Sequence, residues 1–172
     1  MIIKRKLYSS LKNKDHVKLY HVTKIVNIPS IKREGLKIKY YKTRQDNLLM
    51  GINDKDFLYF VLDRYKLVKP LRVGKEAIIE FSIPKDVFDK MKKSFGDPEY
   101  HIYKKHKDIN SWVDYRISIF KKLDPIKFKD LTREKFLEES TSLEYMSPEN
   151  TVIIFEDVSK EYITNIYYDN KA

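Results

Sequence analysis

The stretch LYHVTKIVNIPSIKREGLKI, residues 19–38, contains the clearest structural signal in this sequence. Its first part alternates and is rich in β-forming residues, which predicts a strand over 17–22. Asn27 then suits the N-cap of a short helix, and Gly35 suits its C-cap. The pattern therefore places His21 at the end of a strand that leads directly into a helix.

Apolar runs and alternation predict more strands and short helices along the chain. The expected strands are 57–63, 76–84, 142–147, 150–157 and the end of 159–169. The expected helices are 4–13, 27–35, 84–91, 109–122 and 132–140, with a further short helix at the start of 159–169. Because strands dominate and the helices are short, the sequence predicts an α+β fold with a mostly antiparallel or mixed sheet. Its length predicts one domain, residues 1–172.

The composition favours a polyanionic partner. Among 172 residues, 35 are Lys or Arg and 25 are Asp or Glu, which gives a net charge of +10. Such an excess favours nucleic acid or another acidic surface, although a lysine-rich surface that simply faces water would have the same composition. Cysteine is absent, which excludes disulfides, thiolate metal sites and a cysteine nucleophile.

Other classes of protein are disfavoured by what the sequence lacks. No window approaches the roughly 20 apolar residues of a membrane span, and the basic N-terminus has no apolar signal core. We therefore expect a cytoplasmic protein with no membrane association. The four glycines are far apart, so no glycine-rich phosphate loop can form, which disfavours a parallel nucleotide-binding fold.

Three positions suggest chemistry. The imidazole of His21 can bind a ribose hydroxyl, and the extended backbone beside it can bind a planar carboxamide. The ring of Tyr59, with Tyr65 six residues later, can stack on a flat heteroaromatic ring. Glu144 lies within an apolar strand pattern, where a carboxylate that binds ribose could stabilise an oxocarbenium-like transition state.

Each position also has a purely structural explanation. A core histidine satisfied by a neighbour would explain His21, and the 13 tyrosines of the chain make any one of them unremarkable as a signal. Glu144 could face outward on an edge strand. The carboxylates that compete with it for a catalytic role are Glu138, Glu139 and Glu149.

Taken in order, three segments resemble the ADP-ribosyltransferase superfamily of the His-Tyr-Glu type. They are LYHVT with IPSIKREGL, then FLYFVLD, then LEYMSPENTVIIFEDVSKEYI, and together they cover about a third of the chain. In that family a His-x-Thr strand precedes a helix ending in Glu-Gly-Leu. An aromatic strand follows, and a late strand carries the catalytic glutamate. The first segment is similar to the branch that modifies DNA bases.

The resemblance implies a split sheet core and NAD as the substrate. It assigns catalytic roles to His21, Tyr59 and Glu144. The residues that it implies for binding NAD are His21, Val22, Thr23, Tyr59 and Tyr65. His21 would hold the adenine-side ribose, the Val22 backbone the nicotinamide amide, and the tyrosines the nicotinamide ring. Glu144 would bind the other ribose and promote loss of nicotinamide, after which an acceptor attacks the anomeric carbon, without any metal.

Two departures from the family bear on the acceptor and the site. Val22 stands where the family often has glycine, which a backbone contact tolerates. Ser142 precedes Glu144 by two residues, so there is no Glu-x-Glu pair, and modification of arginine is disfavoured. The acceptor remains open between DNA, RNA and protein, and the role open between toxin, effector and regulator.

Two other functions compete. The tRNA 2′-phosphotransferases share the His-x-Thr and Gly-Leu elements and also consume NAD, but they need several arginines near these motifs, which this chain does not provide. A non-catalytic nucleic-acid-binding module is the other alternative, because 100–107 and 119–129 interleave aromatic and basic residues. His101 and His106 have no further ligands at metal-site spacing, so no metal site is expected.

Overall fold

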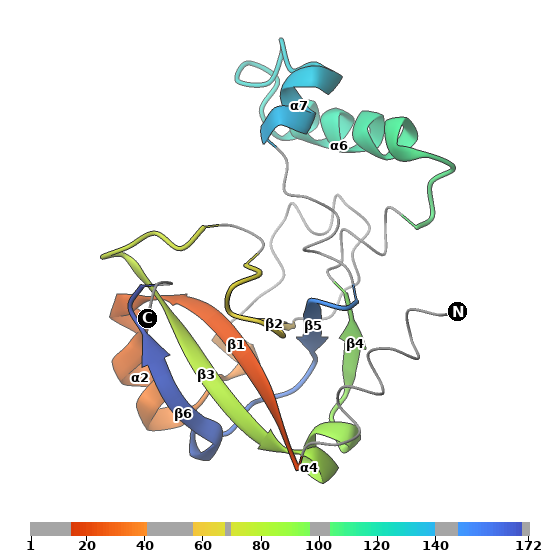
Figure 1. Ribbon diagram of the computed structural model, residues 1–172. Helices are drawn as coiled ribbons and strands as arrows, with labels where there is room; N and C mark the ends of the chain where they lie inside the picture. Colours follow the sequence, from red (N-terminus) through yellow and green to blue (C-terminus); the bar gives the residue numbers. More distant parts are fainter. Residues whose placement is uncertain (1–14, 41–56, 68–69, 97–103, 140–147, 170–172) are drawn as a thin grey trace.

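The computed structural model describes residues 15–40, 57–67, 70–96, 104–139 and 148–169 (Figure 1). The strands are β1 His16–Lys24, β2 Leu58–Val61, β3 Glu76–Pro84, β4 Lys93–Phe95, β5 Thr151–Ile154 and β6 Ile163–Tyr167. The α-helices are α2 Ile28–Glu34, α4 Lys85–Lys90, α6 Ile109–Leu123 and α7 Arg133–Glu139. Short 3-10 helices are η1 Ile25–Asn27, η2 Ile38–Tyr40 and η3 Lys160–Tyr162.

The strands form one six-stranded sheet in the order β4-β5-β2-β1-β3-β6. Every described strand pairing is antiparallel, so the α+β prediction is confirmed and the antiparallel alternative replaces the mixed one. β1 and β3 pair along their whole length, from His16 opposite Pro84 to Lys24 opposite Glu76. In contrast, β1 and β2 pair in the described residues only where Tyr20 faces Val61. The sheet thus consists of two three-stranded halves with a narrow joint between them.

Most of the predicted elements are present. The strand over 17–22 is β1, and the segments 57–63, 76–84 and 150–157 contain β2, β3 and β5. The helices predicted over 27–35, 84–91, 109–122 and 132–140 are α2, α4, α6 and α7, and 159–169 contains η3 followed by β6. β4 was not predicted. The helix expected at 4–13 and the strand expected at 142–147 lie outside the described residues.

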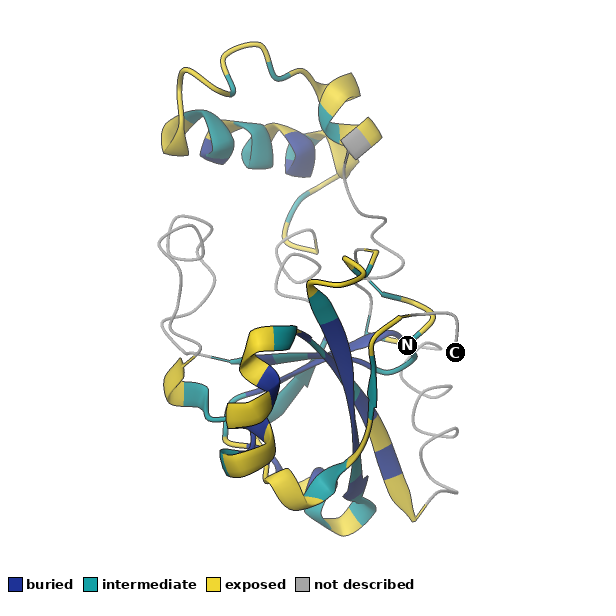
Figure 2. Ribbon diagram, turned by 90° about the vertical axis from the view of Figure 1, so that its left-hand side faces the viewer, coloured by how far each residue is buried: buried dark blue, intermediate teal, exposed yellow. Residues whose placement is uncertain are grey.

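The main core lies on one face of the sheet. Alternation along β1 sends Val17 and Leu19 to this face, where they are fully buried. Phe60 of β2 and Phe81 of β3 meet there edge to face, with ring centroids 5.9 Å apart. Helix α2 covers the core with its buried side and exposes the other (Figure 2). The period of 3.6 residues along this short helix explains that division.

Helices α6 and α7 form a second hydrophobic cluster. Trp112 and Ile119 of α6 are buried there, and Phe136 of α7 packs against Trp112 with ring centroids 5.7 Å apart. Asp108 caps α6 by accepting a hydrogen bond from the Ser111 backbone N–H at 2.8 Å. This cluster shares no residue with the sheet core. None of the described helices has both the length and the apolar character needed to cross a membrane.

Gly35 ends α2 at the point where the chain passes close to the segment before β6. Its φ of +78° is a conformation that favours glycine. Immediately after it, Leu36 exchanges two backbone hydrogen bonds with Val158, at 2.9 and 3.0 Å. A Cβ atom added at Gly35 would lie only 2.5 Å from the Val158 carbonyl oxygen. The close approach of these two segments therefore depends on glycine.

We expect Gly35→Ala to lower the free energy of unfolding by roughly 2 kcal/mol or more, because it adds a backbone clash to an unfavourable φ. Gly74→Ala is the matched control, since Gly74 has a φ of +79° with nothing within 4 Å of the added Cβ. We expect the free energy of unfolding of that control to fall by about 1 kcal/mol, because of the positive φ alone. Urea unfolding of both variants measures the difference, and equal losses would contradict the close-approach explanation.

Candidate functional site

His21 lies at the joint between the two halves of the sheet. Its side chain points to the core face, where it is only 5% exposed. The ring Nδ1 is 2.8 Å from the backbone carbonyl oxygen of Tyr59 in β2, and the ring packs against Phe60 with centroids 5.5 Å apart. Because a carbonyl only accepts hydrogen bonds, Nδ1 is the nitrogen that donates. The imidazole thus joins β1 to β2 next to their single described ladder pair.

The surroundings of His21 keep its ring neutral. Burial lowers the pKa of His21 below its ordinary value, and the hydrogen bond to the Tyr59 carbonyl opposes this only in part. A neutral ring that carries its hydrogen on Nδ1 has Nε2 as its acceptor nitrogen. In this protonation state an imidazole can accept a hydrogen bond from a hydroxyl group, such as one on a ribose.

Thr23 and Asn27 connect the strand to the helix that follows. Thr23 is buried, and its Oγ1 accepts a hydrogen bond from Asn27 Nδ2 at 3.3 Å. Asn27 occupies the N-cap position of α2 as predicted, but its side chain makes no capping hydrogen bond. Instead it ties the start of the helix back to β1. The predicted strand-to-helix unit therefore has a polar link beside His21.

Tyr59 comes near His21 through its backbone and not through its ring. Tyr20 faces Val61 across the joint, and side chains alternate along each strand. Phe60 therefore shares the face of His21, as their ring contact shows, and the side chain of Tyr59 lies on the other face. A ligand that touches both side chains must reach around the strand ends, where β1 finishes at Lys24 and β2 begins.

The remaining predicted site residues are more scattered. Val22 is half-buried on β1, on the face opposite His21. Tyr65 is 63% exposed, and its hydroxyl accepts a hydrogen bond from Arg64 Nη2 at 2.5 Å. Glu144 lies outside the described residues. Of its competitors, Glu149 is exposed just before β5, and Glu138 and Glu139 belong to α7.

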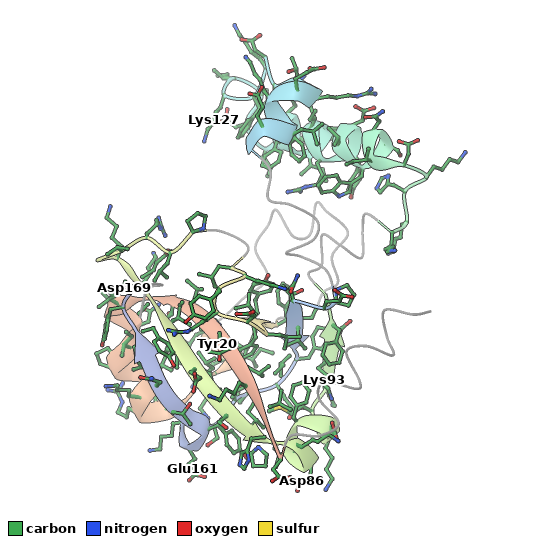
Figure 3. All side chains as sticks on the ribbon, in the orientation of Figure 1. Tyr20, Asp86, Lys93, Lys127, Glu161 and Asp169 are labelled. Carbon is green, nitrogen blue, oxygen red and sulfur yellow. The ribbon has the colours of Figure 1, made fainter. Side chains whose placement is uncertain are left out.

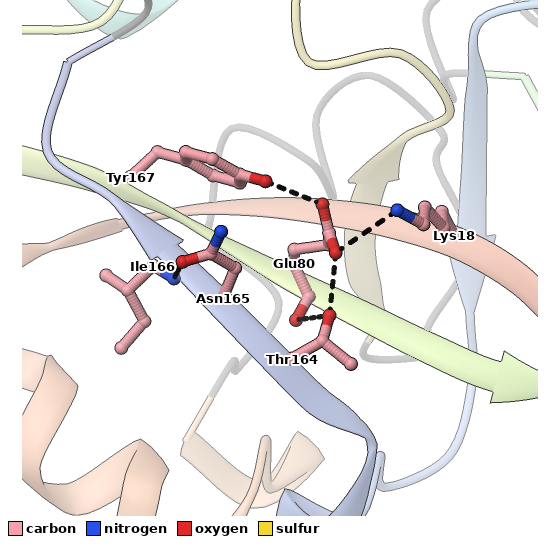
Figure 4. A network of polar contacts seen from close by, with 6 residues as sticks. All are labelled: Lys18, Glu80, Thr164, Asn165, Ile166 and Tyr167. Carbon is pink, nitrogen blue, oxygen red and sulfur yellow. Dashed lines mark hydrogen bonds and ion pairs between the residues drawn. The ribbon is translucent and has the colours of Figure 1, made fainter. Parts of the chain in front are cut away.

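The sequence did not reveal a polar network on the face opposite the core, around Glu80 of β3 (Figure 4). Glu80 is only 5% exposed. It accepts hydrogen bonds from the Thr164 hydroxyl at 2.7 Å and the Tyr167 hydroxyl at 2.9 Å, and it pairs with Lys18 at 3.5 Å. Burial favours the neutral acid, but these partners outweigh it and lower the pKa of Glu80. The network connects β1, β3 and β6.

Tyr20, labelled in Figure 3, belongs to the same network. It faces Glu80 across the β1–β3 ladder, so its side chain lies on the same face of the sheet as that carboxylate. Burial and the negative charge of Glu80 raise the pKa of Tyr20 to about 12. A raised phenol pKa means that this network stabilises the neutral tyrosine. Its contribution to stability is therefore complete below pH 10 and is lost as the pH rises through about 12.

We expect Tyr20 to titrate at about 12 when it is followed by NMR of ring-labelled tyrosine, with Tyr20→Phe to assign the signal. Glu80→Gln removes the negative charge and should move this pKa toward the ordinary tyrosine value of 10. Glu76→Gln is the matched control, because Glu76 lies on the same strand but pairs with Arg72. A Tyr20 signal that titrates near 10 in the unmodified protein, or that ignores Glu80→Gln, would show that the network is not formed.

Comparison of the chain with protein-family models, with curated proteins and with solved structures finds no match. Within the described ranges, no three His, Asp or Glu side chains gather closely enough to hold a metal ion.

Proposed function

We propose that this chain is an ADP-ribosyltransferase that uses NAD as a substrate, transfers ADP-ribose to a macromolecule and releases nicotinamide. The observation that carries the proposal is the setting of His21. A neutral, buried imidazole is fixed by its Nδ1–H at the joint of a divided antiparallel sheet, in the first of the three segments that resemble this superfamily. Such a histidine can orient a ribose hydroxyl without adding charge.

The roles implied by the resemblance are compatible with the neighbouring backbone. In the described residues, β1 pairs with β2 at Tyr20 alone, and backbone groups outside a ladder can bind a planar amide. The Val22 backbone would hold the nicotinamide amide there, and Thr23 would support the strand end. Tyr59 and Tyr65 would contact the nicotinamide ring from around the strand ends, because Tyr59 does not share the face of His21.

Glu144 would perform the chemical step together with this binding apparatus. Its carboxylate would bind the hydroxyls of the nicotinamide ribose and stabilise the positive charge that develops as the glycosidic bond breaks. Nicotinamide leaves, and a nucleophile of the acceptor forms the new bond at the anomeric carbon. All of these groups belong to the chain or to the substrates, so the reaction as proposed uses no metal.

Nucleic acid is the acceptor class that we favour. The net charge of +10 favours binding to backbone phosphates, and the first segment is similar to the DNA-modifying branch. Transfer of the 2′-phosphate of an RNA is less well supported, because it requires several arginines near the site. Arg33, Arg72 and Arg133 are instead paired with carboxylates. The nicotinamide-release assay described below distinguishes a non-catalytic binding module from either enzyme.

We expect the purified protein to release nicotinamide from NAD, and to do so faster with the acceptor polymer present. Glu144→Gln should lower the rate by about 100-fold or more, because it removes the charge that stabilises the transition state. Glu149→Gln, which changes an exposed carboxylate close by in the chain, is the matched control and should retain activity. DNA, RNA and a protein extract are compared as acceptors, and stimulation by a nucleic acid should weaken steeply with salt.

Absence of release under every one of these conditions would contradict the proposed function. Equal rates for Glu144→Gln and the unmodified protein would also contradict it. Binding of nucleic acid without turnover, unchanged by Glu144→Gln, would favour the binding module.

A further inference from the structure

The loop between α6 and α7, residues 124–132, presents an apolar side chain to solvent (Figure 1). Ile126 in this loop is 87% exposed, the highest fraction among the large exposed apolar residues of the described chain. A single exposed apolar residue is common on protein surfaces and by itself indicates nothing. Ile126 differs because the loop that carries it is firmly held and because the residues around it are basic.

Local hydrogen bonds fix the conformation of the α6–α7 loop. Asp124 donates its backbone N–H to the Phe120 carbonyl at 3.0 Å, and its carboxylate accepts from the Lys127 N–H at 2.9 Å. The Phe128 N–H donates to the Asp124 carbonyl at 3.1 Å. Ile126 lies between these bonds, which hold its side chain outward. A contact residue that is ordered in advance loses little conformational freedom when a partner binds.

The aromatic rings of this segment support the loop and do not face a partner. The sequence suggested that the aromatic residues of 119–129 could stack on bases. Instead, Phe120 and Phe128 pack on each other with ring centroids 5.1 Å apart, and Phe120 lies 6.2 Å from Phe136 of α7. Ile126 is therefore the apolar group that the loop offers.

Lysines outnumber acidic residues on both sides of Ile126. They are Lys121, Lys122, Lys127 and Lys129. None of the four forms an ion pair with a described carboxylate, and Lys127 is labelled in Figure 3. The acidic residues of the same segment are Asp124, which accepts the hydrogen bond within the loop, and Asp130. An exposed apolar side chain flanked by unpaired lysines is complementary to a partner that combines negative charge with apolar surface.

We propose that the α6–α7 loop is a docking surface for nucleic acid, in which Ile126 inserts between neighbouring bases and the lysines contact the phosphates on either side. Apolar side chains of this size separate stacked bases in many nucleic-acid-binding proteins, and cationic neighbours hold the backbone beside them. A lipid surface is a poorer match, because it requires a broad apolar face and the loop offers one isoleucine near two aspartates. The use of this surface for the acceptor of ADP-ribose rests on the proposed function, whereas the binding surface itself does not.

The test is titration of the full chain with short single-stranded DNA and RNA that contain the fluorescent base 2-aminopurine, followed by anisotropy and by emission intensity. We expect both strands to bind and the emission to rise, because 2-aminopurine brightens when its stacking is lost. Ile126→Ala should weaken binding about fivefold or more and abolish the rise in emission. It should leave the salt dependence unchanged, because it removes no charge.

Removal of lysines should have the opposite signature. Lys122→Gln/Lys129→Gln should lower the slope of log affinity against log salt by about 0.7 for each lysine, while the rise in emission at saturation persists. Val73→Ala is the matched control for Ile126→Ala, since Val73 is 72% exposed in the turn before β3. Lys90→Gln/Lys160→Gln is the matched control for charge, because both lysines are exposed on other elements. Both controls should bind like the unmodified protein.

Several results would overturn the proposal. They are absence of binding to either strand, equal affinity of Ile126→Ala and the unmodified protein, and the same salt slope in the two lysine variants. Binding to vesicles of anionic phospholipid that depends on Ile126, without binding to either strand, would assign the loop to a lipid surface and would also overturn it. Ile126 is so exposed that its replacement leaves the packing of the helices intact, so a loss of affinity reports on contact with the strand.

This proposal and the proposed function fail in different ways. Binding of a strand that depends on Ile126, without any release of nicotinamide from NAD, would retain the docking surface and remove the transferase. Release of nicotinamide that a nucleic acid stimulates equally in Ile126→Ala and in the unmodified protein, with equal affinity for the strand, would retain the transferase and remove the docking surface.

Discussion

The hydrogen bond from His21 Nδ1 to the Tyr59 carbonyl is the interaction on which the arrangement of the sheet depends. β1 belongs to one half of the sheet through its continuous ladder with β3, and β2 belongs to the other through its ladder with β5. Between the halves, the described residues contain one ladder pair and this side-chain bond. Replacing a ladder hydrogen bond with a side chain keeps a buried carbonyl satisfied while the strands separate. The same bond determines which nitrogen of the neutral ring carries the hydrogen, namely Nδ1.

The two faces of the sheet have different characters because of how the strands alternate. One face supplies the apolar core under α2, and His21 is among the few polar groups buried there. The other face contains the Glu80 network, which reaches from Lys18 on β1 to Tyr167 on β6 and spans the irregular register at Glu80 and Phe81. It therefore links the edge strand β6 to β3 and β1. Ile78 and Val61 are also buried on this second face, so the network lies beside packed apolar side chains.

Local patterns in the sequence were enough to predict the elements but not the site. The strand-to-helix unit from β1 to α2 was predictable because alternation, a proline and Gly35 all act within a few residues. β4 was missed because three residues carry no usable period. The side of the sheet on which the Tyr59 ring lies depends on how β2 is aligned with β1. The Glu80 network joins residues from strands that are far apart in the chain. Neither feature can be predicted from the sequence without knowing how the strands pair. The resemblance to ADP-ribosyltransferases remains a prediction, and Glu144 lies outside the described residues.

The most direct test of the role of His21 is the ¹⁵N NMR spectrum of its imidazole, recorded as a function of pH. The chain has four histidines, so His21→Phe assigns the signal. We expect a neutral ring with its hydrogen on Nδ1 at pH 7. Because burial lowers the pKa of His21, the ring should remain neutral below its ordinary value of 6.5. The stability that it contributes should be complete above that ordinary value, decline as the pH falls below it, and be fully lost once the pH has passed the lowered pKa. An imidazolium at pH 7, or a ring protonated on Nε2 alone, would show that His21 does not donate to Tyr59 and that the joint is held in another way.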